Sequence, residues 1–585
     1  MNIIGLNIFH ADTSACLIKN NELVAAAEEE RFVRIKHYSG FPKNSIEYCL
    51  KEGNLKLSDI DYVCVNFNIN YNFLKKIIFL FKNFLNINFF PRLSTITKRQ
   101  DIKKLFYENF SENITAKIIN VPHHLSHIAS AYLCSGFNKS LGLTFDGTGD
   151  FSSLELYDIK NDNFKIEKKI SFPHSLGIFY QTVTQYLGFK YYGEEYKVMG
   201  LAAYGNKKYV DEMYQLFEIK KNNSYRLNLD YFKHHYKSFS YYFENGAPSF
   251  ENFFNEKFEK LFNKKSRLSN EPINQFHKDI AASAQHVFEE IVLILLRKKL
   301  KDSNYKNLCI AGGCAFNSTL MGKIKNEFTE LNVFVQPNSG DAGGAVGAAL
   351  YTNMKYNKNF KSNKFTNPYL DPSYSNKFIK DTIIDDIKDN NIEVIYFEEF
   401  DKLTEFVSKR ILNNDVVGWF QGRMEWGPRA LGNRSILANP KSSNMKDIIN
   451  SKIKKREEFR PFAPSVLDTK INEYFEGSSD NLDFMSYVVN AKNEDICKII
   501  PAVVHSDGTS RVQVVRKNIN EKFYKLIESF NKISGVPILL NTSLNVNEPM
   551  CESPKQAFNV FTSSSMDVLV LENYVLIKNR THESR

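Results

Sequence analysis

The chain has 585 residues, which at 100–200 residues per domain suggests about three to five domain-sized units. Hydrophobic residues make up 43% and charged residues 24%, which excludes an intrinsically disordered or collagen-like chain. The formal net charge of +10 is mild for this length: it suits phosphate-bearing ligands and predicts no nucleic-acid partner.

No segment has the pattern of a targeting signal or a membrane span. The first residues lack Lys and Arg and include Asp12, unlike a secretory signal. The apolar segment 73–90 contains several lysines, whereas a spanning helix needs about 20 nearly uncharged residues. The cysteines are scattered without a CxxC pair, which is typical of a reducing compartment. We therefore expect a cytoplasmic protein without a membrane span.

The first part of the chain alternates predicted strands and helices. The alternating pattern of residues 1–28, broken by a turn at 19–22, predicts a hairpin. A helix is expected after Pro42 and a strand at 62–67. Residues 66–113, rich in Phe, Asn and Lys, look like an insertion. The segments that follow predict a strand at 116–121, a helix from Pro122 and a strand at 141–150.

The alternation continues to the C-terminus and predicts an α/β protein. An aromatic-rich segment at 205–275 looks like a second insertion, and a long helix is expected at 280–301. The best domain boundary is 352–376, which is rich in Asn and Lys, contains two prolines and lacks periodicity. Residues 377–585 form a second α/β unit.

A pair of histidines follows the predicted helix start at Pro122. His123 and His127 are four residues apart, on one helical face, so both imidazoles can reach one cation. The same spacing also occurs in solvated or buried histidine pairs without a metal. His124 points elsewhere on the helix and is expected either to support a ligand residue or to be structural.

Three glycine-rich segments follow predicted strands: DGTGD (146–150), AGGCAFN (311–317) and SGDAGGAVGAA (339–349). Glycine lets backbone N–H groups approach phosphate oxygens, and a following helix N-terminus adds positive potential. Each segment alone fits a tight turn, whereas three in one domain favour a nucleotide cleft. With the two histidines, Asp146 and Asp341 would form a His₂Asp₂ set that suits Fe(II), Mn(II) or Zn(II).

A cationic cluster marks the C-terminal part of the chain. Guanidinium groups bind carboxylates and phosphates bidentately. The alternative is a solvated basic face, but the proline turns at 427–428 and 461–464 favour an anion pocket because they fix the neighbouring side chains. The cluster comprises Arg423, Arg429, Arg434, Lys454, Lys455, Arg456, Arg460, His505 and Arg511, and a polar strand end adds Asn541, Thr542, Ser543 and Asn545.

In this order the motifs resemble those of the NodU/CmcH-type O-carbamoyltransferase family. The resemblance covers nearly the whole chain except the two insertions, and it also includes EEERFVRIKHYSGFP, HHLSHIASAY, GEEYKVMGLAAYG, GPRALGNRSILANP, REEFRPFAPS and LLNTSLN. It implies a TsaD-like N-terminal domain of the ASKHA class, with two RNase H-like lobes, at 1–351. A linker at 352–376 and a YrdC-like α/β domain at 377–585 would follow.

The resemblance also implies a two-step reaction. The C-terminal domain would make carbamoyl-adenylate from ATP and carbamoyl phosphate, with Mg(II). The N-terminal domain would transfer the carbamoyl group to a hydroxyl of a small molecule, sugar or nucleotide-linked sugar. The implied metal is Fe(II), or another divalent ion, and a homodimer is reasonable for the family. Its implied ligands are His123, His127, Asp146 and Asp341.

The remaining site residues are likewise implied by the resemblance. Catalytic roles would fall to His10, beside the acceptor hydroxyl, and to Lys36 and Arg460. The first loop, HADTSA, is one residue longer than the family's usual HDASA, which affects the placement of His10. The N-terminal site for carbamoyl-adenylate would comprise Lys36, Asp146, Gly147, Thr148, Gly149, Gly177, Gly312, Gly313, Asn317 and Gly340. The C-terminal site would comprise Arg429, Lys454, Arg460, Arg511, Asn541 and Ser543.

Two other functions stay open from the sequence. A tRNA threonylcarbamoyl-type transferase would need to bind tRNA, and the lack of a long basic stripe speaks against it. A non-enzymatic ASKHA-type switch protein would use the phosphate loops but leave the C-terminal cationic motifs without a role. AMP formation that depends on carbamoyl phosphate separates the O-carbamoyltransferase from such a switch.

Overall fold

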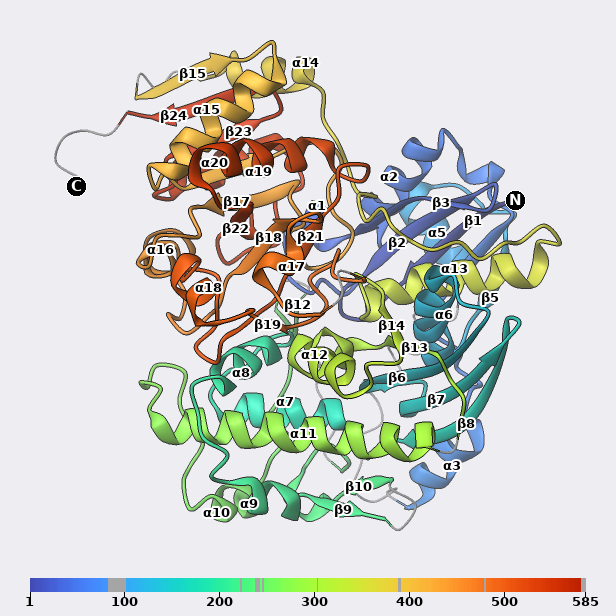
Figure 1. The fold of residues 1–585 in the computed structure, drawn as a ribbon. Helices are drawn as coiled ribbons and strands as arrows, with labels where there is room; N and C mark the ends of the chain where they lie inside the picture. Colours follow the sequence, from blue (N-terminus) through green and yellow to red (C-terminus); the bar gives the residue numbers. More distant parts are fainter. Residues whose placement is uncertain are drawn as a thin grey trace. The chain divides into compact units, whose positions relative to one another are not determined.

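The computed structural model describes residues 1–82, 101–220, 224–236, 242–244, 247–301, 303–387, 391–477 and 480–579 (Figure 1). The chain divides into two compact units, Met1–Phe365 and Thr366–Arg585. The division falls inside the segment 352–376. Both units combine strands with helices, so the predicted α/β class is confirmed.

The first unit contains two five-stranded sheets of the same topology. Their orders are β3-β2-β1-β4-β5 and β14-β13-β6-β7-β8, and each consists of an antiparallel three-stranded meander followed by two parallel strands. This repeated topology is that of two RNase H-like lobes, as expected. The strands are β1 (Asn2–Asn7), β2 (Ser14–Lys19), β3 (Glu22–Glu28), β4 (Tyr62–Val65), β5 (Lys117–Asn120), β6 (Lys139–Gly149), β7 (Ser152–Lys160), β8 (Asn163–Ser171), β13 (Asn307–Ala311) and β14 (Asn332–Val335).

Helices α6 (His123–Ser135) and α13 (Asp341–Tyr356) pack against each other, and α13 also covers β1 and β2 (Figure 1). Their close approach requires a glycine at position 347, because a Cβ there would lie 1.7 Å from the carbonyl oxygen of Ser126. The N-termini of both helices thereby lie near each other. The other helices of the lobes are α1 (Glu30–Val33), α2 (Lys43–Gly53), η1 (Leu57–Asp59), α7 (Leu176–Tyr186), α8 (Glu195–Ala202), α11 (Gln275–Lys301), η3 (Gly313–Phe316) and α12 (Ser318–Glu327).

The first expected insertion, 66–113, belongs in part to the core. It contains α3 (Phe73–Lys82) and α5 (Ile102–Phe110). Ile102 and Phe106, one helical turn apart on α5, are buried in the core of the first lobe, where the Phe106 ring contacts Phe41 edge-on. Residues 83–100 lie outside the described part of the chain.

The second expected insertion, 205–275, forms a small aromatic core of its own. The Tyr186 ring at the end of α7 lies 5.3–5.8 Å from the rings of Phe254, Phe258 and Phe262. Part of the aromatic excess of the sequence therefore packs this segment onto the lobe. Its elements are α9 (Val210–Gln215), β9 (Phe217–Ile219), β10 (Tyr225–Leu227), η2 (Leu229–Tyr231), β11 (Tyr242–Glu244), β12 (Ala247–Ser249) and α10 (Glu256–Leu261).

The second unit is built on an eight-stranded mixed sheet of order β15-β24-β23-β16-β17-β22-β18-β21. Its strands are β15 (Ile392–Tyr396), β16 (Val417–Phe420), β17 (Arg434–Ala438), β18 (Ala463–Leu467), β21 (Gln513–Val515), β22 (Ile538–Ser543), β23 (Val568–Leu571) and β24 (Tyr574–Lys578), beside the pair β19 (Val489–Asn490) and β20 (Thr509–Ser510). Its helices are α14 (Asn376–Ile379), η4 (Lys380–Ile384), α15 (Phe400–Leu412), α16 (Met445–Ile448), η5 (Ile449–Lys454), α17 (Ile471–Tyr474), α18 (Glu494–Ile499), α19 (Glu521–Ser534) and α20 (Pro554–Ser563).

Among the residues that the structure describes, no helix combines the length and the apolar character needed to cross a membrane.

Candidate metal centre and arginine cluster

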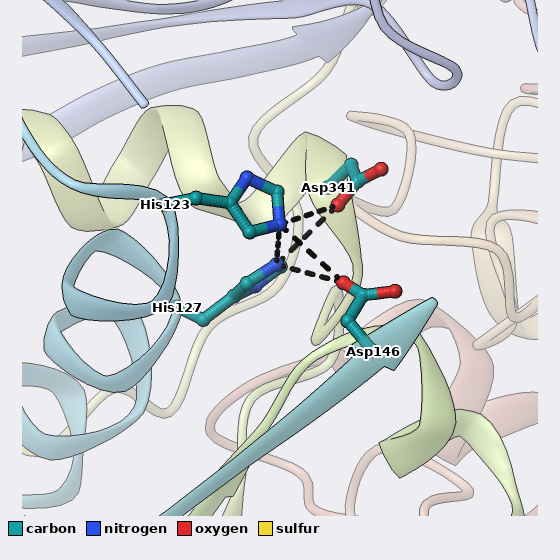
Figure 2. Close-up of side chains that lie close together, drawn as sticks. All are labelled: His123, His127, Asp146 and Asp341. Atoms are coloured by element: carbon teal, nitrogen blue, oxygen red, sulfur yellow. Dashed lines mark hydrogen bonds and ion pairs between the residues drawn. The ribbon is translucent and has the colours of Figure 1, made fainter. Parts of the chain in front are cut away.

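Three elements of the first unit bring four predicted ligands together (Figure 2). His123 and His127 lie in the first two turns of α6, and Asp341 is the first residue of α13. Asp146 lies in β6 where its pairing with β7 is interrupted between Phe145 and Gly149. The interruption lets the Asp146 side chain face α6 instead of continuing the ladder.

The four side chains point their ligand atoms at one another. The Nε2 atoms of His123 and His127 lie 3.0 Å apart, 3.5 and 3.0 Å from Asp146 Oδ2, and 3.4 and 3.3 Å from Asp341 Oδ1. Such distances are typical of the edges of a coordination polyhedron with metal–ligand bonds of about 2.1 Å. Two imidazole nitrogens and two carboxylate oxygens form a donor set for a borderline divalent cation.

The electrostatics of this cluster also fit a cation. Asp341 Oδ1 is buried, and it faces the Nε2 atoms of His123 and His127. Burial alone would raise the pKa of Asp146, but hydrogen bonds from His123 and His127 hold it well below its usual range. Burial would lower the pKa of His127, yet Asp146 and Asp341 raise it to about 9. The two carboxylates thus supply negative charge that a metal ion can use in place of a proton.

His10, the predicted acceptor-side histidine, lies at the edge of the same cluster. Its Nδ1 is 2.5 Å from Asp341 Oδ2, and its ring centroid is 5.7 Å from that of His123. Asp341 therefore presents one oxygen to the ligand histidines and the other to His10. Burial would raise the pKa of Asp341, but His10 and His127 lower it below its ordinary value. The longer first loop still places His10 beside the candidate metal centre.

Several predicted N-terminal site residues surround Asp146. The Gly147 and Gly313 N–H groups donate to its carboxylate at 2.6 and 3.3 Å. Gly149 packs against the His123 ring, where a Cβ would lie 2.0 Å from the nearest ring atom. Asn317 instead caps α12 by accepting from the Leu320 N–H, and it pairs with the Gln285 amide. Of the other predicted members, Thr148 is half-buried in the same loop, Gly312 has a φ of +98°, and Gly340 precedes α13.

Gly177 is the best test of how this loop is held. A Cβ at Gly177 would lie 2.7–2.8 Å from the backbone of Gly147 and Asp146, whereas a Cβ at Gly147 would meet nothing within 4 Å. We expect Gly177→Ala to displace Asp146 and to weaken metal binding about 10-fold or more. Gly147→Ala, the matched control, should bind metal as the unchanged protein does. The measurement is metal affinity by competition with a chelator, and equal affinities would contradict the expectation.

Lys36 is not brought to the four ligands by any contact among the described residues. It is exposed in the turn after α1. The next residue, His37, contacts other parts of the protein instead. Its ring Nδ1 lies 2.7 Å from Asp12 Oδ1, and its backbone N–H donates to the Glu30 carboxylate. Burial would lower the pKa of His37, but Asp12 and Glu30 raise it to about 9. In this motif it is therefore His37 that makes contacts within the protein, whereas the sequence had pointed to its neighbour Lys36.

In the second unit, four arginines lie close enough for their charges to interact. Burial lowers the pKa of Arg511 well below its usual range, and Arg429, Arg456 and Arg460 lower it further. The Arg511 Nε atom is buried without a hydrogen-bond partner. Burial also lowers the pKa of Arg429 to about 10. We call Arg429, Arg456, Arg460 and Arg511 the arginine cluster; all four are half-buried, and such a concentration of positive charge fits a bound polyanion.

Two arginines of the predicted cationic cluster have a different role. The Arg434 guanidinium donates to the carbonyl oxygens of Gln421, Gly422, Pro372 and Asn433 and stacks on the Phe420 ring. Arg423 donates to the carbonyl oxygens of Leu370 and Asp371. Both stabilise the fold of the second unit. The expectation that they line an anion pocket is therefore not met, because hydrogen bonds to backbone carbonyls direct both guanidinium groups into the fold.

The polar residues predicted beside the arginine cluster form a network of their own. Lys454 is buried and donates to oxygens of Ser543 and Asn545. The Asn541 amide donates to Ala430, Ser465 and Gln513, which leaves its Oδ1 buried and without a partner. This network ties strand β22 to the loop that carries Arg429.

The sequence matches two family models that together span most of the chain. Residues 2–350 match the model described as "Carbamoyltransferase N-terminus", and residues 408–578 match "Carbamoyltransferase C-terminus". The chain belongs to the carbamoyltransferase family. It is therefore an enzyme of the carbamoyltransferase class, as the motifs predicted.

Relatives cover nearly the full length of the chain. Nodulation protein NolNO of Sinorhizobium fredii is 37% identical over 98% of this chain and 80% of its own length. An uncharacterized protein of Synechocystis is 35% identical over 99% of this chain and 97% of its own. Among solved structures, HypF from T. kodakarensis matches with 14% identity and a TM-score of 0.31, over 62% of this chain and 48% of its own.

Proposed function

We propose that this carbamoyltransferase is an ATP-dependent O-carbamoyltransferase that works in two half-reactions. In the first, carbamoyl phosphate, ATP and water give carbamoyl-adenylate, pyrophosphate and phosphate. In the second, a hydroxyl oxygen of the acceptor forms a bond to the carbamoyl carbon, the bond from that carbon to the adenylate oxygen breaks, and AMP leaves. We assign the formation of carbamoyl-adenylate to the second unit of the chain, and the transfer of the carbamoyl group to the first unit.

The arginine cluster is the observation that carries the first half-reaction. Carbamoyl phosphate and ATP are both polyanions, and adenylyl transfer depends mainly on positioning and charge neutralisation. Burial and three neighbouring positive charges disfavour the charged form of Arg511 in the free protein. A bound polyanion would offset this repulsion. Mg(II) is proposed to accompany ATP.

The four-ligand cluster of the first unit supports the second half-reaction. His123, His127, Asp146 and Asp341 would hold a divalent cation, which the family resemblance makes Fe(II). When bound, such a cation stabilises negative charge on the carbamoyl oxygen or the adenylate phosphate. The N-termini of α6 and α13, both at this cluster, add positive potential for a phosphate.

His10 is positioned to act on the acceptor. Its Nδ1 faces Asp341, which orients the ring, and the opposite nitrogen would take the proton of the acceptor hydroxyl. We propose that the acceptor is a small molecule, sugar or nucleotide-linked sugar.

One assay tests this function. The protein is incubated with ATP, Mg(II) and carbamoyl phosphate, and pyrophosphate release is measured; candidate hydroxyl acceptors are then added and examined by mass spectrometry for gain of a carbamoyl group. Pyrophosphate release that requires carbamoyl phosphate supports the proposal. Release without carbamoyl phosphate, or carbamoylation of tRNA in preference to small acceptors, would overturn it.

A further inference from the structure

A tight turn in the second unit, residues 505–509, holds a histidine in a defined orientation. The His505 N–H donates to the Thr509 carbonyl oxygen at 2.7 Å, and the Gly508 N–H donates back to the His505 carbonyl oxygen at 3.0 Å. On the side-chain side, His505 Nδ1 lies 3.0 Å from Thr509 Oγ1. The other ring nitrogen, Nε2, is buried and has no hydrogen-bond partner.

The hydrogen bonds of Thr509 fix the tautomer of this ring. Thr509 Oγ1 lies 2.6 Å from Asp507 Oδ1. An ionised carboxylate only accepts, so the single hydroxyl proton goes to Asp507, and the hydroxyl must accept from His505 Nδ1–H. The chain Asp507–Thr509–His505 therefore leaves Nε2 with a free lone pair, which is a buried hydrogen-bond acceptor.

The ring keeps this neutral form because its surroundings oppose a positive charge. Burial lowers the pKa of His505 to about 4, and Arg511 and Lys446 lower it further against the opposing effect of Asp507. Arg511 is also the member of the arginine cluster whose pKa is lowered by the charges of the other three. His505 Nε2 is thus an acceptor in a ring that lies near enough to Arg511 for their charges to interact, and a guanidinium group can only donate.

A ligand of this cluster must satisfy both kinds of group. Guanidinium groups bind the phosphate and carbonyl oxygens of an acyl phosphate, but they offer nothing to an N–H. Carbamoyl phosphate carries an amino group on its carbonyl carbon, whereas acetyl phosphate carries a methyl group and inorganic phosphate carries neither. A buried acceptor without a partner favours the ligand that brings a donor, since leaving it unpaired costs binding free energy.

We propose that His505 Nε2 accepts a hydrogen bond from the amino group of carbamoyl phosphate, and that His505 is the residue that selects this donor over other acyl phosphates. This role rests on the proposed function of the second unit. No covalent bond to His505 forms or breaks in this role. The imidazole accepts a hydrogen bond from the amino group, and the arginine cluster binds the phosphate.

Binding measurements on three variants test the assignment. Affinities of carbamoyl phosphate, acetyl phosphate and inorganic phosphate are measured by calorimetry for the unchanged chain, His505→Leu, His505→Gln and Thr509→Val. His505→Leu should lose carbamoyl phosphate affinity about 10- to 100-fold and keep phosphate affinity within about 2-fold. His505→Gln, whose amide oxygen can reach the place of Nε2, should restore most of the preference, and Thr509→Val, which frees the tautomer, should lose part of it.

The outcomes separate this inference from the proposed function. Unchanged protein that binds carbamoyl and acetyl phosphate equally, or His505→Leu that keeps the preference, would overturn the role of His505. A parallel loss of all three ligands in His505→Leu would also overturn it, since that result indicates a structural role. Failure of the proposed function would appear elsewhere, as pyrophosphate release that does not require carbamoyl phosphate.

Discussion

His127→Ala is expected to fold, to contain almost no metal and to lose carbamoyl transfer, while keeping pyrophosphate release that depends on carbamoyl phosphate. The Nε2 atom of His127 lies within 3.0–3.3 Å of the other three ligand atoms, so its removal opens the middle of the donor set. Changes to residues that only support a ligand typically cost 10–100-fold in metal affinity, so loss of a ligand should cost at least about 100-fold. Elemental analysis of the purified variant measures the metal directly.

The chain offers a matched control on the same helix. His124 is buried like His127, but its Nδ1 contacts Thr144 Oγ1 and it contributes no atom to the four-ligand cluster. His124→Ala should keep its metal and lose about 1–3 kcal/mol of stability through the lost hydrogen bond. Full metal retention in His127→Ala, or metal loss in His124→Ala alone, would remove His127 from the ligand set.

The proximity of His123 and His127 was predictable because their spacing is local. The four-residue spacing of His123 and His127 fixes their common face once the helix begins after Pro122. Asp146 and Asp341 each stand at a strand or helix end, where an α/β fold gathers functional residues. The α/β class was predictable because alternation of short strands with helices specifies the class of fold before any long-range contact is known. The two lobes, by contrast, were implied by the family resemblance.

The arginine cluster shows why the rest was not predictable. Arg429 and Arg434 are five residues apart in the same motif, yet one belongs to the cluster and the other stacks on Phe420 and binds carbonyl oxygens. The sequence shows that a residue is a charged arginine, but it does not show which backbone carbonyls its N–H groups will contact in the fold. The same limit separates exposed Lys36 from inward-facing His37. Likewise, Ile102 and Phe106 looked like part of an insertion because only tertiary packing reveals a core helix.

Arg511→Met is expected to abolish pyrophosphate release and yet to stabilise the protein. Burial and the charges of Arg429, Arg456 and Arg460 all oppose a positive charge at this position, and Arg511 Nε lacks a hydrogen-bond partner. Replacing such a half-buried, mutually repelling charge by an apolar side chain of similar length should raise the free energy of unfolding by about 1 kcal/mol. For a unit of this size that corresponds to a rise of about 2–4 °C in Tm. The activity should fall because the cluster loses the group that the others surround.

Arg434→Met is the control for this result. Arg434 is a fully buried arginine of the same unit, and the same substitution there should lower the free energy of unfolding. The Arg434 guanidinium satisfies four carbonyl oxygens and packs on Phe420, so its loss leaves buried acceptors unpaired and should cost about 3 kcal/mol or more. Thermal unfolding of both variants, with and without ATP and carbamoyl phosphate, separates the two roles. Ligands that stabilise the unchanged protein should no longer stabilise Arg511→Met. A fall in Tm for Arg511→Met as large as that for Arg434→Met would show that Arg511 stabilises the fold, and the arginine cluster would then lose its assignment as the polyanion site.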